Sequence, residues 1–192
     1  MNNLNSKRKD KDTNTTNNIV FTGIFTAIII ILSQIAIPTS PVPFTLSLLA
    51  IFLTGILLPP RQAFLAVLVY ILLGAFGLPV FAGMKGGVSA LFGPTGGYIL
   101  AYPLMALIIS LSRKYARKYK TLVLILGMLV SLFICYLLGT LWFSYITGTS
   151  FAASLALCVY PYIIFDLLKI GLAIFFSSIL GKTCPYVFRS FD

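Results

Sequence analysis

The chain has 192 residues, of which 59% are hydrophobic and only 9% are charged, whereas soluble domains carry roughly 25% charged residues. So few charges cannot cover a surface exposed to water, and the composition therefore excludes a soluble globular fold and indicates a protein that lies in a lipid bilayer. The net charge of +10 does not indicate nucleic-acid binding, because the basic residues cluster between long apolar runs and form no polar recognition surface.

The set of reactive side chains is small. The chain contains no histidine, and its four acidic residues are all aspartates. Its three cysteines, at positions 135, 158 and 184, match no zinc or redox spacing, and Cys135 is most simply a packing residue inside an apolar run. We therefore expect no metal and no bound cofactor, and no histidine-based acid–base chemistry.

The N-terminal region combines a polar tail with a first membrane span. Residues 1–18 are rich in Asn, Thr, Lys and Asp, a composition that predicts disorder. Residues 19–37 form an apolar run of the length needed to cross the hydrocarbon, and no small-residue cleavage site follows it. Pro38, Pro41 and Pro43 then end the helix in a stiff loop.

Five further apolar runs follow the first. Their ranges are 45–58, 62–78, 98–112, 121–145 and 160–180. The segments between them are a Pro-Pro-Arg turn at 59–61, a Gly-rich segment at 79–97, a basic stretch at 113–120, and a polar turn at 147–150 that leads to a short interfacial helix. We therefore expect an all-α integral membrane protein, a compact bundle of six transmembrane helices with structured outer loops. Residues 19–182 would form the membrane domain, between a disordered tail at 1–18 and a short tail at 183–192.

The distribution of Lys and Arg predicts the orientation of the chain in the membrane. Six spans place both termini on one side, together with the four cations of the N-terminal tail, Arg61, the five cations between 113 and 120, Lys182 and Arg189, twelve in all. The opposite side holds only Lys85, since Lys169 lies within the last span. The positive-inside bias then predicts a multi-pass membrane protein with both termini in the cytoplasm. The Pro-rich and Gly-rich loops would face outward and form a pocket there.

Asp166 and Lys169 are the main candidates for chemistry. They lie three residues apart in the last span, on one helix face, although each charge costs roughly 2.5–3.5 kcal/mol near a helix centre. One interpretation is a mutual ion pair that lowers this cost. The other is a ligand site, in which Lys169 holds a carboxylate and Asp166 accepts hydrogen bonds from ligand N–H groups. Both interpretations can hold together.

Two glycine-containing patterns are further candidates for a functional role. The segment from Gly77 to Tyr98 alternates glycine with apolar residues, which favours a packed loop with accessible amides over a flexible one. Lys85, within it, could be a second anion partner, but a solvated loop lysine is the simpler interpretation. Gly23 and Ala27 form a small-xxx-small pattern that permits close helix approach.

Gly181-Lys182-Thr183 resembles the end of a phosphate-binding loop. The motif requires a glycine at position 176, which is Phe176 here, so the match fails. Any ATP-driven transport therefore needs an ATPase on another chain.

Several of these motifs occur together in one known family. The segments Pro41-Val-Pro-Phe-Thr45, Gly77-Leu-Pro-Val-Phe-Ala-Gly83, Gly93-Pro-Thr-Gly-Gly-Tyr98 and Asp166-Leu-Leu-Lys169 resemble the BioY family, the biotin-specific substrate-binding S-components of energy-coupling factor (ECF) transporters. The resemblance covers roughly residues 19–182.

The resemblance implies biotin uptake without enzymatic activity. It also implies assembly with a transmembrane coupling subunit and two cytosolic ATPase subunits that use ATP. The substrate-binding residues it implies are Thr45, Phe81, Gly83, Gly97, Tyr98, Asp166 and Lys169. Gly23 and Ala27 would contact the coupling subunit. Ser47 departs from the family pattern, where a glutamine is expected, so one first-loop contact would differ. The resemblance also implies that the membrane is a bacterial cell membrane. The alternatives are transport of another small vitamin or, with less support, an intramembrane enzyme.

Overall fold

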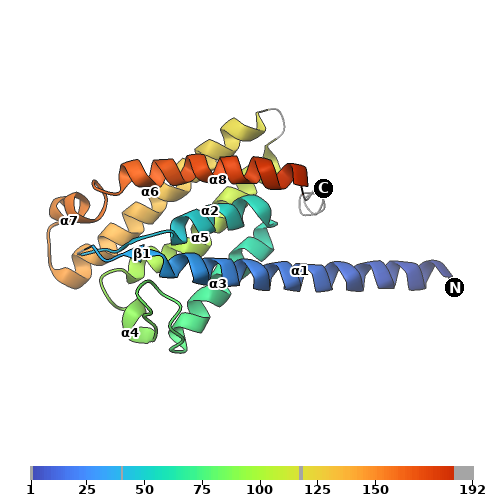
Figure 1. Ribbon diagram of the computed structural model, residues 1–192, viewed down its shortest axis with the longest axis horizontal. Coiled ribbons are helices and arrows are strands. Elements are labelled where there is room, and N and C mark those ends of the chain that lie inside the picture. The colour runs from blue at the N-terminus through green and yellow to red at the C-terminus, as the bar shows by residue number, and fades with distance from the viewer. Residues whose placement is uncertain (1, 40, 117–118, 184–192) are drawn as a thin grey trace.

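The structure is a computed structural model that describes residues 2–39, 41–116 and 119–183 (Figure 1). The elements in chain order are α1 (Asn2–Gln34), β1 (Ala36–Ile37), β2 (Phe44–Thr45), α2 (Ser47–Leu57), α3 (Pro60–Ala75), α4 (Val88–Leu91), α5 (Gly96–Tyr115), α6 (Lys120–Thr147), α7 (Phe151–Cys158) and α8 (Ile163–Thr183). In the described part of the chain, α1, α2, α3, α5, α6 and α8 correspond to the six predicted spans, and the all-α membrane fold is confirmed.

Four of the described helices are long and apolar enough to cross a bilayer. They are α5, α6, the part of α1 from Thr16 to Gln34 and the part of α8 from Ile163 to Leu180. α2 is shorter, with 11 residues, and at 1.5 Å per residue it extends about 16 Å of the roughly 30 Å hydrocarbon thickness. Most of its side chains are buried, because it packs against α1, α5 and α8.

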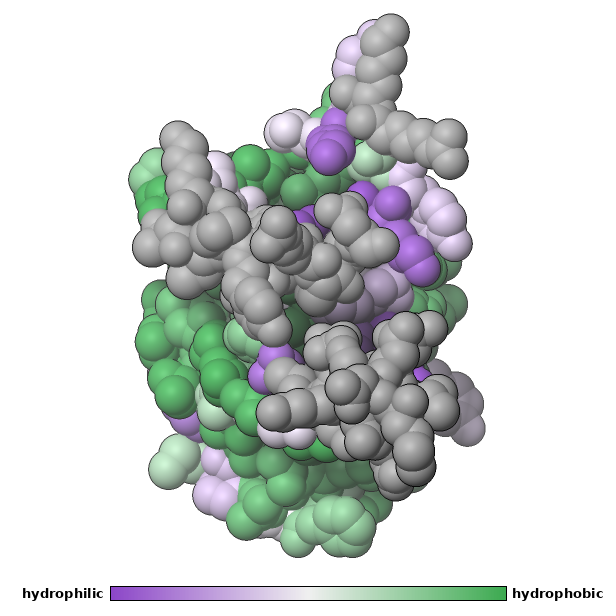
Figure 2. Space-filling view, turned by 90° about the vertical axis from the view of Figure 1, so that its right-hand side faces the viewer, coloured by the Kyte–Doolittle hydropathy of each residue, from purple (hydrophilic) through white to green (hydrophobic). Residues whose placement is uncertain are grey.

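The core lies where α2, α3 and α5 meet. α5 packs against α6, α3 and α2, and α1 packs against α2 and α3. The largest fully buried apolar side chains include Ile29, Phe52, Tyr70, Met105 and Met128. In contrast, many large apolar residues of α1, α6 and α8 are exposed, as expected for helix faces that contact lipid. Figure 2 shows hydrophobic flanks around the end of the bundle that holds both termini, with hydrophilic residues gathered on that end.

The N-terminal tail differs from the prediction. Composition predicted disorder for residues 1–18, whereas α1 is helical from Asn2 onward. Once the apolar part of α1 has nucleated a helix, each further residue adds one hydrogen bond at little cost, and the helix can extend into a polar segment. The predicted C-terminal tail from residue 184 onward lies outside the described residues.

The loops that the sequence predicted to face outward are structured, as expected. The Pro-rich loop is the turn of a short hairpin in which Ala36 pairs with Thr45 and Ile37 with Phe44. The Gly-rich segment contains α4, and the stretch after the polar turn at 147–150 forms α7. Pro161 lies just before α8, which begins at Ile163. Figure 1 shows β1, α4 and α7 at one end of the molecule and both termini at the other.

Candidate functional site

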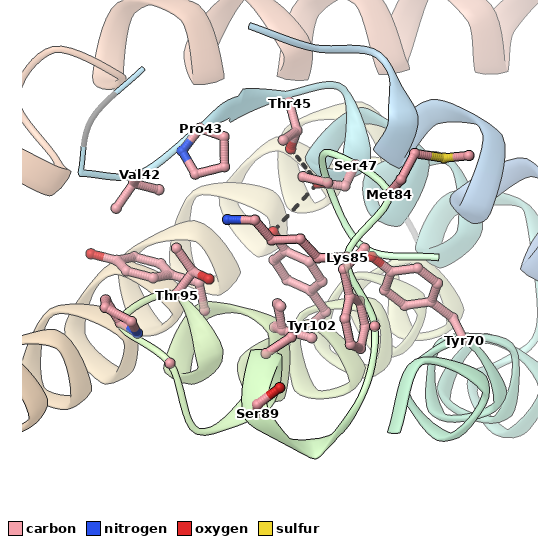
Figure 3. Close-up of a pocket in the computed structure, with 18 of the residues that line it drawn as sticks. Val42, Pro43, Thr45, Ser47, Tyr70, Met84, Lys85, Ser89, Thr95 and Tyr102 are labelled. Atoms are coloured by element: carbon pink, nitrogen blue, oxygen red, sulfur yellow. Dashed lines mark hydrogen bonds between the residues drawn. The ribbon is translucent and has the colours of Figure 1, made fainter. Parts of the chain in front are cut away.

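A cavity of about 650 Å³ lies among the structured loops at the end opposite the termini. Its wall is formed by the hairpin, the Gly-rich segment and the first turns of α5 (Figure 3). The lining residues are Pro41, Val42, Pro43, Thr45, Ser47, Tyr70, Phe81, Ala82, Met84, Lys85, Gly86, Ser89, Ala90, Gly93, Pro94, Thr95, Tyr98, Ile99 and Tyr102. Pockets for small molecules are typically of roughly 300–1,000 Å³ and mostly apolar with a few placed polar groups, and this cavity fits that description.

Hydroxyl groups form one polar side of the cavity. The Ser47 hydroxyl hydrogen-bonds to the Thr45 hydroxyl and lies 3.4 Å from the Tyr102 hydroxyl. Figure 3 shows these three linked hydroxyl groups at the cavity wall. The Tyr70 hydroxyl is held 3.1 Å from that of Ser33. A hydroxyl can both donate and accept, so this wall can bind an uncharged polar ligand group. Ser47, the departure from the family pattern, therefore lines the cavity and is buried.

The loop that closes another side is held by Gln34, at the end of α1. The Gln34 Nε2 lies 3.3, 2.9 and 3.2 Å from the carbonyl oxygens of Pro79, Val80 and Phe81. Its Oε1 accepts a hydrogen bond of 3.1 Å from the Met84 backbone N–H. One side chain thus supports both arms of the loop.

The same loop has an unusual backbone. Phe81 and Lys85 form an isolated antiparallel bridge, and between them Gly83 has φ 71° and Met84 has φ 58°. Positive φ is unusual for a non-glycine residue, and such backbone conformations cluster at functional sites. The Phe81 ring is buried and packs edge-on against Tyr70, with the ring centroids 5.4 Å apart. The loop is therefore packed, as the alternation of glycine with apolar residues predicted.

Asp166 and Lys169 form a buried ion pair. The Lys169 Nζ lies 2.7 Å from Asp166 Oδ1, and each residue is only 4% exposed. The second carboxylate oxygen of Asp166 accepts a hydrogen bond of 2.5 Å from the Tyr136 hydroxyl. The Lys169 ammonium also lies 4.2 Å from the centroid of the Phe44 ring, within the range of a cation–π interaction. The mutual ion pair proposed for this motif is therefore present.

The ion pair faces a smaller cavity beside the large one. This cavity, of about 50 Å³, is lined by Asp166, Lys169, Phe44, Tyr136 and Cys135 among others. The two cavities share lining residues, namely Val42, Pro43, Thr45, Tyr98 and Tyr102. The pair thus lies toward the bundle interior and not toward lipid, separated from the large cavity by one layer of side chains.

Two glycines allow α5 and α6 to approach closely behind this site. A Cβ at Gly97 would lie 2.3 Å from Trp142 Cβ, and one at Gly139 would lie 2.2 Å from the Tyr98 ring. The Tyr98 hydroxyl is hydrogen-bonded to that of Thr140 at 3.1 Å. These contacts hold the Tyr98 ring between the helices, where it lines both cavities.

The predicted site residues fall into three groups. Thr45, Phe81 and Tyr98 line the large cavity. Asp166 and Lys169 line the small one.

The remaining two predicted residues line neither cavity. Gly83 shapes the loop by its positive φ, and Gly97 permits the helix contact. Both act through the backbone, so neither needs to face a ligand.

Some residues at the site were not predicted from the sequence. Gln34, Tyr70, Tyr102 and Tyr136 lie inside apolar runs as isolated polar side chains. Their only signal was this isolation, since a polar group in a membrane span is usually hydrogen-bonded or functional. Their partners come from distant segments, which a single sequence does not reveal.

Gly23 and Ala27 lie on an exposed face of α1. A Cβ at Gly23 would meet no atom within 4 Å. The two small residues therefore lie on a face of α1 that the described part of the chain leaves exposed.

The bundle and its cavities define a multi-pass membrane protein with a small-molecule pocket at one end. Among the described residues, no group of three or more His, Cys, Asp or Glu side chains could hold a metal ion. The profile of the BioY family matches residues 4–185. The chain belongs to the BioY family.

Relatives and one solved structure agree with this assignment. The chain is 38% identical to the "Probable biotin transporter BioY" of Pyrococcus horikoshii over 84% of its own length and 94% of the relative. It is 36% identical to the "Biotin transporter BioY2" of Lactococcus lactis, over 86% of this chain and 90% of the relative. It also resembles a crystal structure described as the S-component for biotin from an ECF-type ABC transporter, with a TM-score of 0.77 and 26% identity over 88% of this chain and 93% of that one.

Proposed function

We propose that this chain is the S-component of an ECF-type transporter and captures biotin at the outer face of the membrane. The observation that carries the proposal is the cavity of about 650 Å³ at the loop end of the bundle. The chain matches most of the length of relatives that are named biotin transporters. The function is transport, and the intramembrane-enzyme alternative has no support in the family.

Biotin suits this site chemically. It has an apolar ring system, a ureido group with two N–H donors and one carboxylate. The large cavity offers apolar side chains from Val42, Pro43 and Ile99, a hydroxyl wall and the backbone of a packed glycine loop. A mostly hydrophobic pocket with a few placed polar groups is the expected complement of such a ligand.

We assign the substrate contacts to both cavities. Thr45, Phe81 and Tyr98 would contact the substrate directly from the large cavity. Asp166 and Lys169 would form the deep polar boundary of the binding site. The substrate would reach them when the side chains shared by the two cavities move apart. Gly83 would contribute by shaping the loop, and Gly97 by allowing α5 and α6 to approach closely.

The orientation follows from charge. α1 begins and α8 ends at the same end of the molecule (Figure 1). Most Lys and Arg residues lie in the segments that the sequence assigns to that end, and the positive-inside bias favours the cytoplasm for it. The cavity would then open outward, where it can collect a nutrient.

Energy for import must come from partners. The chain has no phosphate-binding loop, and we infer that a transmembrane coupling subunit and two cytosolic ATPase subunits supply the ATP-driven step. The open face of α1 around Gly23 and Ala27 suits close approach of another membrane helix, and we propose it as the contact with the coupling subunit.

A ligand titration tests the function. The purified protein in detergent is titrated with biotin, thiamin and riboflavin by calorimetry. Saturable binding of biotin alone is expected. Binding of thiamin or riboflavin in its place would support the alternative of another vitamin, and binding of none of the three would contradict the proposal.

A further inference from the structure

Two lysines lie near the cavities, and among the described residues only Lys169 has a charged partner. Lys169 faces the small cavity, and Lys85 lines the large one. We propose that Lys85, and not Lys169, supplies the positive charge that binds the carboxylate of the substrate. The inference rests on the proposed function, because it assumes an anionic ligand of the size of biotin in the large cavity.

The charge of Lys169 is already compensated. Its ammonium contacts Asp166 at 2.7 Å and the Phe44 ring at 4.2 Å, and the residue is 4% exposed. A ligand carboxylate that bound Lys169 would have to share its ammonium with Asp166 or displace Asp166, and displacement would leave that buried carboxylate without its cation, which is strongly unfavourable. Such a ligand would also bring a second negative charge next to Asp166.

The charge of Lys85 has no such partner. Asp166 is the only acidic residue between Asp12 and Asp192, and it is bound to Lys169. Within the described ranges, no hydrogen bond or ion pair involves the Lys85 ammonium. Figure 3 shows the Lys85 side chain extending from its loop over the cavity, toward the hairpin that carries Pro43. A bound carboxylate would therefore be a counter-ion that the described part of the chain does not supply.

The Lys85 side chain is exposed, but its backbone is held in place. Its backbone is bridged to Phe81, with N···O distances of 2.9 and 3.2 Å. The preceding residue, Met84, has φ 58° and donates its N–H to Gln34. A cation presented from a fixed backbone loses less freedom when it binds an anion, so it binds more tightly.

The test compares biotin with biotinamide, which has the same shape but no negative charge. Binding of both is measured by calorimetry for the wild type, Lys85→Gln, Lys85→Arg and a control, Lys114→Gln. Lys114 is an exposed lysine in the last turn of α5, whereas the cavity lies at the first turns of this helix. Lys85→Gln should weaken biotin about tenfold or more and leave biotinamide nearly unchanged. Lys85→Arg and Lys114→Gln should behave like the wild type.

Added salt gives a second readout. The affinity of the wild type for biotin should fall as NaCl is raised, because the Lys85 site is open to solvent and is screened. Lys85→Gln should lose most of this dependence.

Two outcomes would overturn the assignment of Lys85 while leaving the function intact. One is an equal loss of biotin and biotinamide binding in Lys85→Gln, and the other is no loss of either. If the wild type binds neither ligand, the proposed function itself fails. Retained biotinamide binding in Lys85→Gln shows that the variant is folded.

Discussion

At the residue scale, the ion pair of Asp166 and Lys169 serves stability as well as the site. Each charge alone would be costly in the bundle, but the pair is satisfied by mutual contact, by Tyr136 and by the Phe44 ring. Removing one partner leaves the other buried and uncompensated, whereas removing both leaves only a packing change. The two kinds of variant should therefore differ in stability.

We expect Asp166→Asn to destabilise the protein strongly, by about 3–5 kcal/mol. In this variant the Lys169 ammonium remains buried but loses its only ionic partner among the described residues. The double variant Asp166→Asn/Lys169→Met should recover much of this loss. Unfolding in detergent at increasing denaturant concentration measures the difference. A double variant no more stable than the single one would show that the pair is not held together by mutual compensation.

At the scale of elements, the approach of α5 and α6 positions Tyr98. Gly139 faces the Tyr98 ring so closely that a methyl group there would lie 2.2 Å from a ring atom. The helices can separate only by disturbing the ring that lines both cavities. Gly139 on α6 therefore affects the position of the Tyr98 ring on α5.

Gly139→Ala should cost about 1–3 kcal/mol of stability through overpacking and weaken substrate binding by displacing Tyr98. The matched control is Gly171→Ala on α8, where an added Cβ meets nothing within 4 Å. Thermal unfolding and ligand titration of both variants provide the comparison. Equal behaviour of the two variants would contradict the role given to the α5–α6 contact.

The loop that carries Lys85 depends on α1 through one side chain. Gln34 bonds to Val80 on one arm and to Met84 on the other, so the loop is fixed by a helix distant from it in the chain. Without these bonds the loop keeps its bridge between Phe81 and Lys85 but loses its anchor.

We expect Gln34→Leu to speed amide hydrogen exchange in residues 79–85 and to raise the dissociation rate of the substrate more than it lowers the association rate. The reason is that a loosened loop releases a bound ligand sooner. Exchange mass spectrometry and stopped-flow kinetics measure the two effects. The turn at 147–150, which Gln34 does not contact, serves as the internal control. Unchanged exchange in the loop would refute the anchoring role.

At the scale of the whole molecule, one face of α1 is free for a partner. Gly23 and Ala27 are exposed, while Phe25 and Ile29 of the same helix are buried in the core. A small-residue face allows another helix to approach closely. Substrate capture and assembly with a partner would thus use different parts of the chain.

Ala27→Leu should leave biotin binding unchanged and lower uptake in cells that supply the coupling and ATPase subunits. A loss of about 1.4 kcal/mol in assembly would reduce the association constant about tenfold. Ala152→Leu on α7, also an exposed alanine, is the matched control. Uptake of labelled biotin, alongside binding to the purified protein, separates the two effects. Normal uptake by Ala27→Leu would place the partner contact elsewhere.

The membrane fold could be predicted from the sequence because it depends on local properties. The scarcity of charge, the lengths of the apolar runs and the prolines and glycines between them indicated six helices and structured outer loops. Helix ends were less certain: α8 begins at Ile163 and α1 extends back to Asn2, since helix propagation and capping depend on neighbouring turns.

The site was predicted only in part. Asp166 and Lys169 were identified as candidates because ionisable residues are rare in membrane spans, and their spacing placed them on one helix face. Gln34, Tyr102 and Tyr136 were not, because each hydrogen-bonds to a segment more than 25 residues away.

By itself, therefore, the sequence determined that this protein lies in a membrane, that it has six apolar segments and that Asp166 and Lys169 share one helix face, since burial in lipid and helix periodicity act over one or two turns. Only the tertiary structure decided that the paired lysine and the unpaired lysine face different cavities. That arrangement depends on the packing of α1, α5, α6 and α8 with the two outer loops, and such packing joins residues that are far apart along the chain.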